Sequence, residues 1–264
     1  MKCVVIGTGY FGKIILSKLK DHDVITVDPV GNSDYKSILD VPFIDGKWFV
    51  VTPASTHYDI LCTLFKKGVR DIWVEKPVCP TIEQTLDIFS MIPNDVFLFC
   101  DFTWLQHSVV KRLGSHVNGV KNINIMWLNS GENTPKDVNI VVDLAIHPIS
   151  ILYYLLLQND DRIDTIRMMS NKNNVFITGE SEHGVTFTIE VSNSFYKKLR
   201  YISLMSDESS IRWSSLEEYY IEGIGNVDTR DALSSNIELF FNRINDVNVI
   251  DIMKIVHKLN LLYK

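Results

Sequence analysis

The sequence predicts an α/β domain with a doubly wound parallel sheet, followed by an α+β domain whose open sheet is mostly antiparallel. Two observations predict this division. Short apolar runs alternate with helical patterns over residues 1–115, whereas longer runs with period-two alternation follow residue 120. We therefore expect domains at residues 1–115 and 116–264, with room for the C-terminal helices to pack back on the first domain.

The first apolar run leads into a glycine-rich turn. Residues 3–12 read CVVIGTGYFG, and an amphipathic helix is expected to follow at about residues 11–20. Gly7 would allow a tight turn, Gly9 would let a pyrophosphate approach the backbone, and Gly12 would let the helix pack closely on the strand. The sequence predicts a dinucleotide site of the Rossmann type here, with Tyr10 and Phe11 at the start of its helix.

The second apolar run, DVITVDP, ends in Asp28, where this motif expects a carboxylate for the ribose hydroxyls. A carboxylate would repel a 2′-phosphate, and the residues that follow contain no arginine to offset that charge. NAD is therefore favoured over NADP. Lys36 lies close enough in sequence to weaken this preference.

Further strands and helices alternate through the first domain. Thr81 and Gln84 stand in capping-box spacing at the start of a helix whose apolar positions are Ile82, Leu86, Ile88 and Phe89. The expected strands are VITVD, KWFVVTP, DIWVEKP and VFLFCDF, and the expected helices are HYDILCTLFKKG and TIEQTLDIFSMI. This alternation is typical of a parallel sheet with right-handed crossovers.

The second half of the chain reads as strands with one buried face. In GVTFTIEVSN, Val185, Phe187, Ile189 and Val191 alternate with polar residues. The other expected strands are KNINIMWLN, NNVFITGE, LRYISLMS, SSIRWSS and EEYYIEG, and helices are expected at about residues 229–244 and 248–262. Such a sheet leaves one face needing cover, which favours a homodimer or homotetramer formed through the C-terminal sheet.

Composition limits the possible partners. The chain has 264 residues, 46% hydrophobic and 22% charged, with a formal net charge of −6 and no cluster of lysine or arginine, which argues against nucleic acid or a membrane surface. The four cysteines, Cys3, Cys62, Cys79 and Cys100, are widely spaced, so we expect buried free thiols and no metal site. A first strand that begins at the N-terminus leaves no room for a signal peptide, which favours the cytoplasm.

Lys76 follows an apolar strand in the segment Glu75-Lys76-Pro77. Ligands bind at the carboxyl ends of such strands, so Lys76 is expected to face a cleft, where it can donate to a substrate oxygen or exchange a proton. The competing interpretation is a surface ion pair with Glu75. A cis peptide bond before Pro77 is a further possibility.

Asp143 and His147 stand four residues apart in VVDLAIHPISILYYLLL and would share one face of a helix. Pro148 disfavours helical geometry at His147, so a helix should begin at Pro148 or kink there. Either outcome places His147 at an irregular point near a helix end. The alternative is a structural histidine.

Together these motifs resemble the glucose-fructose oxidoreductase, inositol dehydrogenase and MocA family of nicotinamide-dependent oxidoreductases over nearly the whole chain. The resemblance rests on the glycine turn, Thr52-Pro53 with His57, Glu75-Lys76-Pro77 and Asp143-X-X-X-His147. It implies an N-terminal Rossmann domain that binds NAD or NADP. It also implies that Lys76 lies near nicotinamide and substrate, and that Asp143 and His147 contact the reacting carbinol.

Two features qualify the resemblance. Ser150 stands where the family commonly has a second acidic residue, and the chain is shorter than most members, which weakens transfer of any particular sugar substrate. Trp104 and His107 follow the strand VFLFCDF where the family lines its substrate pocket, although Trp104 would also suit the core.

The resemblance implies reversible hydride transfer between nicotinamide and a secondary alcohol or ketone of a sugar, cyclitol or nucleotide-linked sugar. His147 would exchange the hydroxyl proton, Lys76 would stabilise the alkoxide, and Asp143 would orient His147 or a neighbouring hydroxyl. Two alternatives stay open: a reductase of a conjugated substrate such as a tetrapyrrole, and a non-catalytic NAD-binding regulator.

Overall fold

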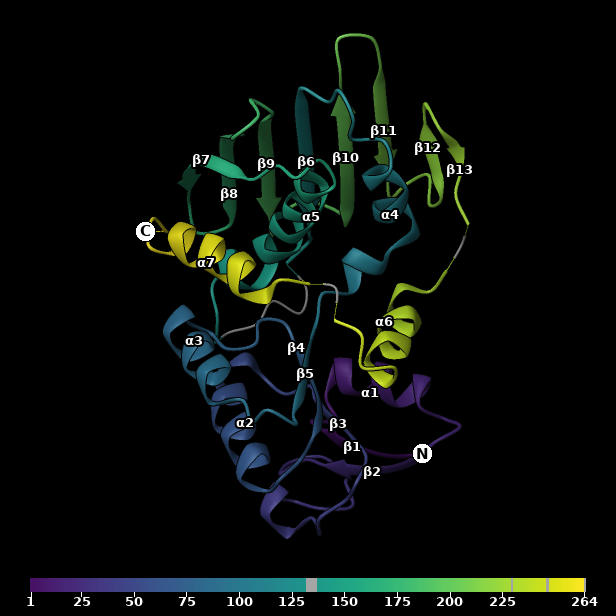
Figure 1. Ribbon diagram of the computed structural model, residues 1–264, viewed down its shortest axis with the longest axis vertical. Coiled ribbons are helices and arrows are strands. Elements are labelled where there is room, and N and C mark those ends of the chain that lie inside the picture. Colours follow the sequence, from purple (N-terminus) through teal and green to yellow (C-terminus); the bar gives the residue numbers. More distant parts are fainter. Residues whose placement is uncertain (132–136, 229, 246, 264) are drawn as a thin grey trace. The chain divides into compact units, whose positions relative to one another are not determined.

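The computed structural model describes residues 1–131, 137–228, 230–245 and 247–263 (Figure 1). Residue 229, where a helix was expected to begin, lies outside them. The chain forms two compact units. Unit 1 comprises Met1–Asp101 and Asn236–Ile250, and unit 2 comprises Phe102–Ser235 and Asp251–Lys264. The chain thus returns to unit 1 after completing the sheet of unit 2.

Unit 1 is built on a five-stranded parallel sheet in the order β2-β1-β3-β4-β5. The strands are β1 (Lys2–Ile6), β2 (Asp23–Val27), β3 (Lys47–Val50), β4 (Asp71–Glu75) and β5 (Phe97–Asp101). Tyr35 extends this order by a parallel bridge to Val27 at the outer edge of β2. The sheet is therefore wound outward in both directions from β1 and β3, and the predicted α/β architecture is confirmed. Doubly wound sheets bind ligands where the strand order reverses.

Helices cover both faces of this sheet (Figure 1). α2 (His57–Lys66) and α3 (Ile82–Met91) lie on one face, and α1 (Tyr10–Lys18) and α6 (Ala232–Phe241) lie on the other. Thr81 caps α3 by accepting from the Gln84 N–H, as predicted, but Leu86 is 42% exposed because α3 buries Ile82, Thr85 and Ile88 instead.

Phe240 of α6 anchors the returning chain on unit 1. Its ring is fully buried and packs edge-on against Phe49 at 5.2 Å and Trp73 at 5.7 Å. Arg243 then reaches Asp71 of β4 at 3.3 Å. Burial of aromatic surface is the dominant force in such contacts. A helix from the end of the sequence therefore completes the core of the first sheet.

Unit 2 contains an eight-stranded sheet in the order β13-β12-β11-β10-β6-β9-β8-β7. The strands are β6 (Asn122–Leu128), β7 (Ile163–Ser170), β8 (Asn174–Ser181), β9 (Thr186–Ser192), β10 (Leu199–Met205), β11 (Ser210–Ser214), β12 (Tyr220–Glu222) and β13 (Gly225–Asn226). All neighbours are antiparallel except β6 and β9. The prediction of a mostly antiparallel sheet is confirmed, although β7 and β13 were not anticipated.

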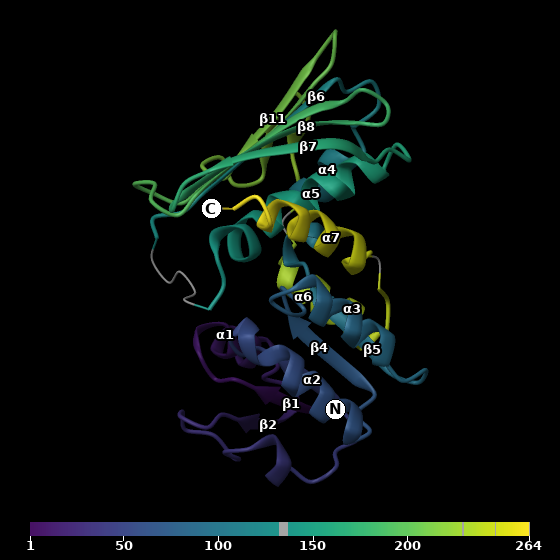
Figure 2. The same cartoon turned by 90° about the vertical axis from the view of Figure 1, so that its left-hand side faces the viewer.

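One face of this sheet is covered by α4 (Ser108–Gly114), α5 (Ile146–Leu157) and α7 (Val249–Asn260) (Figure 2). In β9, Phe187, Ile189 and Val191 are buried and Thr186 and Glu190 are exposed, as the alternation predicted. The sequence pattern did not predict β7 because it is an edge strand. Its residues are all partly or fully exposed, so its hydrophobic alternation is weak.

The helix that carries His147 does not begin at Pro148. α5 starts at Ile146, and a π-helical turn, Val141–Ala145, precedes it. Pro148 lacks an N–H and its ring crowds the carbonyl of Leu144, so the wider π-helical winding before it relieves a conflict that regular α-helix would create. Asp143 lies within that turn, and His147 is the second residue of α5.

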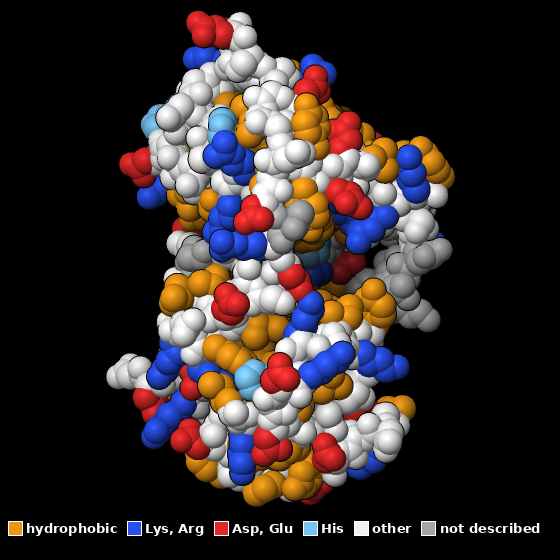
Figure 3. Space-filling model, turned by 90° about the vertical axis from the view of Figure 1, so that its right-hand side faces the viewer, with side chains coloured by type: hydrophobic (Ala, Val, Ile, Leu, Met, Phe, Trp, Pro, Cys, Tyr) orange, Lys and Arg blue, Asp and Glu red, His pale blue; other side chains and the backbone are white. Residues whose placement is uncertain are grey.

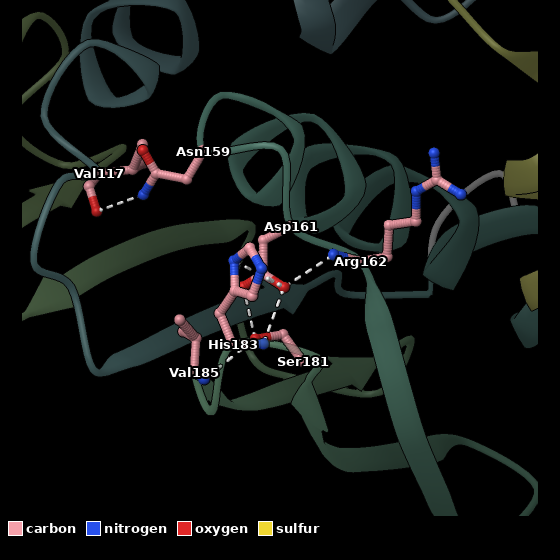
Figure 4. Close-up of polar contacts among 7 residues, drawn as sticks. All are labelled: Val117, Asn159, Asp161, Arg162, Ser181, His183 and Val185. Carbon is pink, nitrogen blue, oxygen red and sulfur yellow. Dashed lines mark hydrogen bonds and ion pairs between the residues drawn. The ribbon is translucent and has the colours of Figure 1, made fainter.

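A buried carboxylate joins the segment after α5 to the end of β8 and the turn between β8 and β9 (Figure 4). Asp161, 2% exposed, accepts from the Ser181 hydroxyl at 2.6 Å, the Arg162 N–H at 2.8 Å and the His183 N–H at 3.1 Å. The Ser181 hydroxyl in turn accepts from the Val185 N–H at 2.9 Å. Buried carboxylates are stable only when paired in this way.

All four cysteines are free thiols; Cys3, Cys79 and Cys100 are buried as predicted, but Cys62 of α2 is partly exposed, contrary to the prediction. Burial raises the pKa of Cys3 to about 11 and that of Cys79 to about 12, so neither is a ready nucleophile.

Within the described residues, the helices are all too short or too polar to cross a membrane. Basic and acidic side chains are interspersed on the face of the molecule shown in Figure 3.

Candidate active site

The glycine turn lies at the point where the strand order of unit 1 reverses. Gly7 has φ of +97°, and a Cβ there would lie 2.6 Å from the Val51 carbonyl oxygen at the end of β3. A Cβ on Gly12 would lie 2.1 Å from the Gly7 carbonyl oxygen. Both positions therefore require glycine, one for its backbone conformation and both for close packing.

At position 9, neither the φ angle nor contact with other protein atoms requires glycine. A Cβ built on it meets no atom within 4 Å, and its φ of −66° suits any residue. It is the N-cap of α1, and the first turn of that helix, beginning with Tyr10 and Phe11, contains no acidic side chain. Open space in front of helix N–H groups is what a phosphate needs, so this turn fits the pyrophosphate of a dinucleotide.

Asp28 follows β2 and is joined to the glycine turn by hydrogen bonds. Thr8 donates its backbone N–H and its hydroxyl to Asp28 Oδ2 at 2.7 and 2.8 Å. Val30 and Gly31 donate their N–H groups to Oδ1 at 2.9 and 3.0 Å. The donors from Gly31 and Thr8 hold the pKa of Asp28 well below its ordinary range. A ribose diol would have to share this carboxylate with the rotatable Thr8 hydroxyl.

Thr52, Pro53 and His57 form the next part of the edge. His57 is 1% exposed, and its Nδ1 and Nε2 lie 2.9 Å from the carbonyl oxygens of Pro77 and Thr52, respectively. The imidazole thus ties the turn after β3 to the turn after β4. His57 is a buried brace, and Pro53 is the exposed residue beside it.

Lys76 emerges directly from β4, and the Lys76-Pro77 peptide bond is cis. The Glu75 carboxylate accepts from the backbone N–H of Lys76. Glu75 is also the cross-strand neighbour of Asp101, which the sequence analysis did not single out. Asp101 is 2% exposed and accepts from Asn236 of α6 at 2.6 Å. Its only sequence signal was a carboxylate at the end of an apolar strand.

In unit 2, three of the predicted residues join one aromatic layer on the helix-covered face of the sheet. His147 stacks on Trp127 at 5.6 Å between ring centroids, and Trp104 meets Trp127 edge-on at 4.6 Å. Trp104 in turn stacks on His107 at 4.9 Å. Trp127 of β6 was not predicted, although its position in a strand with alternating burial marked it as inward-facing.

The layer continues beyond His107, whose ring stacks on Tyr219 at 5.8 Å and contacts Trp213 at 5.6 Å. Burial lowers the pKa of His107, so its imidazole is neutral at physiological pH. Ser150, at the position of the family's usual acid, is 1% exposed and donates to the His147 carbonyl at 2.7 Å. It therefore reinforces its own helix.

Unit 1 thus gathers the glycine turn, Asp28, Thr52, His57 and the Glu75-Lys76 segment along one sheet edge. Unit 2 gathers Trp104, His107 and His147, with Asp143 one turn before His147 on the same helical segment. Across the described ranges, no group of three or more histidine, cysteine, aspartate or glutamate side chains is placed to hold a metal ion.

A parallel sheet with a glycine turn at its switch point, followed by an open sheet backed by helices, is a two-domain α/β and α+β architecture, and solved structures of several dehydrogenases share this fold. UDP-N-acetylglucosamine 3-dehydrogenase GnnA from Acidithiobacillus ferrooxidans superposes with a TM-score of 0.84 at 16% identity, covering 100% of this chain and 97% of that one. Myo-inositol 2-dehydrogenase from Lactobacillus plantarum gives 0.79 at 12% identity, covering 99% and 96%.

GenD2 from gentamicin A biosynthesis, solved in complex with NAD, gives a TM-score of 0.80 at 14% identity and covers 98% of this chain and 92% of that one. No family model and no curated protein matches the sequence. The resemblance inferred from the motifs is therefore confirmed at the level of the fold.

Proposed function

We propose that this chain is an NAD-dependent oxidoreductase that transfers a hydride between nicotinamide and a secondary alcohol or ketone of a sugar, cyclitol or nucleotide-linked sugar. The observation that carries the proposal is the open space in front of Gly9, at the start of α1 and at the switch point of the sheet. The similar solved structures include dehydrogenases of a nucleotide sugar and of a cyclitol, which supports the choice of substrate class.

Unit 1 supplies the cofactor site in this proposal. The N–H groups at the start of α1, with Tyr10 and Phe11, hold the pyrophosphate, and Asp28 accepts from the ribose hydroxyls. Thr52, Pro53 and Glu75 would contact the cofactor further along the same edge, and His57 braces the turns that carry them. Asp28 is ionised at neutral pH, so it repels a 2′-phosphate and favours NAD.

When bound, NAD supplies the carbon that accepts or returns the hydride. His147 removes the proton from the substrate hydroxyl as the C–H bond is lost as hydride, and it returns that proton in the reverse direction. The Lys76 ammonium stabilises negative charge on the substrate oxygen. Asp143 orients His147 or a second hydroxyl, and Trp104 and His107 contact the substrate ring.

The first test is thermal unfolding with NADH and with NADPH at matched concentrations, because a ligand that binds only the folded chain raises its stability. We expect a clear rise with NADH and little with NADPH. A screen of sugars, cyclitols and nucleotide sugars for NADH formation then identifies the substrate. No rise with either nucleotide, in protein free of carried-over cofactor, would refute the proposal.

His147→Asn tests the catalytic assignment. The variant should lose most turnover while keeping the NADH-induced rise, because an asparagine cannot exchange the proton. His116→Asn, at the end of α4, is the matched control and should retain both properties. Equal losses of turnover and cofactor binding in His147→Asn would contradict the role given to His147.

The proposal includes a homodimer or homotetramer formed through the face of the unit 2 sheet opposite its helices. Cross-strand neighbours place Tyr201, Met126, Glu190, Phe176 and Met169 in one row across that face. Met169 is 70% and Phe176 38% exposed. Apart from Glu190 at its centre the row is apolar or aromatic, and an exposed row of this kind is typical of an interface.

Light scattering at several concentrations tests this part of the proposal. We expect a dimer or larger species that dissociates in Phe176→Asp, which would add a second negative charge beside Glu190, its cross-strand neighbour in the row. Leu216→Lys, at another exposed apolar residue of unit 2, is the control and should leave the assembly intact. A monomer for the unmodified chain would refute it.

A further inference from the structure

Arg200 of β10 is a buried cation. Its side chain is 4% exposed, and its Nη1 donates to the carbonyl oxygens of Leu128 and Leu199 at 2.6 and 2.8 Å. Its Nη2 donates to Asn129 Oδ1 at 2.6 Å. All of these acceptors are neutral. Among the described residues no carboxylate pairs with the guanidinium, and the buried Nε–H has no acceptor.

Such a charge is costly to bury, because neutral acceptors replace only part of its hydration. Burial lowers the pKa of Arg200 to about 10, which still leaves the side chain charged at physiological pH. A leucine or methionine could fill the same position on the inner face of a sheet without that cost. A buried, uncompensated cation is therefore a candidate for a functional role.

The Arg200 guanidinium contacts Trp127, a member of the aromatic layer. Arg200 and Trp127 are direct cross-strand neighbours, and the guanidinium carbon lies 4.3 Å from the Trp127 ring centroid. The three hydrogen bonds fix the guanidinium at the end of β6, and cation–π attraction holds it against the Trp127 ring. Trp127 is fully buried, and His147 stacks on its ring at 5.6 Å with an interplanar angle of 27°.

We propose that Arg200 is a positioning residue for His147: it fixes the Trp127 plane on which the imidazole stacks, and its charge opposes protonation of that imidazole. The inference rests on the proposed role of His147 as proton acceptor. A base must be neutral before it accepts a proton, so a nearby fixed cation keeps His147 in its active form to lower pH.

The size of the effect follows from the geometry. The two contacts place the guanidinium carbon within about 10 Å of the imidazole centroid. At an effective dielectric constant of about 20, a unit charge at that distance shifts a titration by about one pH unit. Among the residues of unit 2 that the structure describes, the other titratable or charged groups in or beside this layer are Asp143, His107, Lys198 and Tyr219, and all four are unchanged in the variants below.

The test is an NMR titration of His147 in the full chain without cofactor or substrate, with the signal assigned by its loss in His147→Asn. Arg200→Met removes the charge, and we expect the His147 midpoint to rise by about one pH unit. Arg200→Lys should restore at least half of that difference. Arg212→Met, which removes a half-exposed arginine of β11, should leave the midpoint unchanged.

A purely structural role for Arg200 would lower the unfolding temperature without moving the midpoint, and an unchanged or lowered midpoint in Arg200→Met would overturn the inference. If Arg200→Met does not fold, Arg200→Gln makes the same comparison, because its amide can still donate to Asn129. The titration needs no turnover. A shifted midpoint in a chain without oxidoreductase activity would refute the proposed function alone, whereas activity with an unshifted midpoint would refute the inference alone.

Discussion

Replacing Gly9 by alanine separates the folding role of the glycine turn from its binding role. The added Cβ meets no protein atom within 4 Å, and the backbone at Gly9 already has a φ that alanine adopts. A methyl group at the N-cap costs some helix stability, and the loss of glycine's freedom in the unfolded chain offsets it. We expect the unfolding free energy to change by no more than about 1 kcal/mol.

The cost to cofactor binding should be much larger, because the methyl group occupies the space through which a phosphate would approach the α1 N–H groups. NADH at one hundred times its Kd would raise the stability of the unmodified chain by about 2.7 kcal/mol. For a chain of this length that is a rise of about 5 to 10 °C in Tm. Gly9→Ala should lose nearly all of this rise.

Differential scanning calorimetry with and without NADH measures both quantities, and Gly12→Ala is the comparison. Its Cβ would lie 2.1 Å from the Gly7 carbonyl oxygen, so we expect a loss of about 3 kcal/mol even without ligand. If Gly9→Ala keeps the full NADH-induced rise, the pyrophosphate does not approach Gly9 and the proposed cofactor site is wrong.

Three further predictions concern single polar side chains. Asp161→Ala should lower the free energy of unfolding, measured with urea, by about 3 to 5 kcal/mol, because it leaves three donors without their buried acceptor. The control Asp164→Ala, at an exposed position, should lower it by less than about 0.5 kcal/mol. Asp28→Asn should lower Tm at pH 7. Because folding lowers the pKa of Asp28, its stabilisation is present above the ordinary carboxylate range near pH 4 and is lost only at lower pH, so the difference in Tm should shrink only there. His57→Phe should weaken NADH binding, measured by fluorescence titration, because the carbonyl oxygens of Thr52 and Pro77 lose the ring that joins them.

Local patterns in the sequence predicted most elements correctly. The order of strand, glycine turn and helix at residues 3–12 is specified by steric requirements of individual glycines, which neighbouring residues cannot override. The Thr81 cap of α3 and the buried alternation in β9 are equally local. Where a pattern was ambiguous, prediction was only partly right: His147 lies at an irregular point near a helix start, as expected, but the π-helical turn before Pro148 depends on how the chain relieves a steric conflict, and several solutions were open.

What the sequence determined by itself is the type of each major element and the identity of the residues at the carboxyl ends of the parallel strands. Both follow from periodicities and turn preferences that extend over a few residues. Only the tertiary structure decided which distant residues meet. Phe240 completes a core that begins with Phe49, and Arg200 lies against Trp127, because strand order and helix docking are set by packing between segments far apart in the chain. No local pattern encodes those contacts, so the brace at His57 and the cation beside Trp127 could be recognised only in the folded protein.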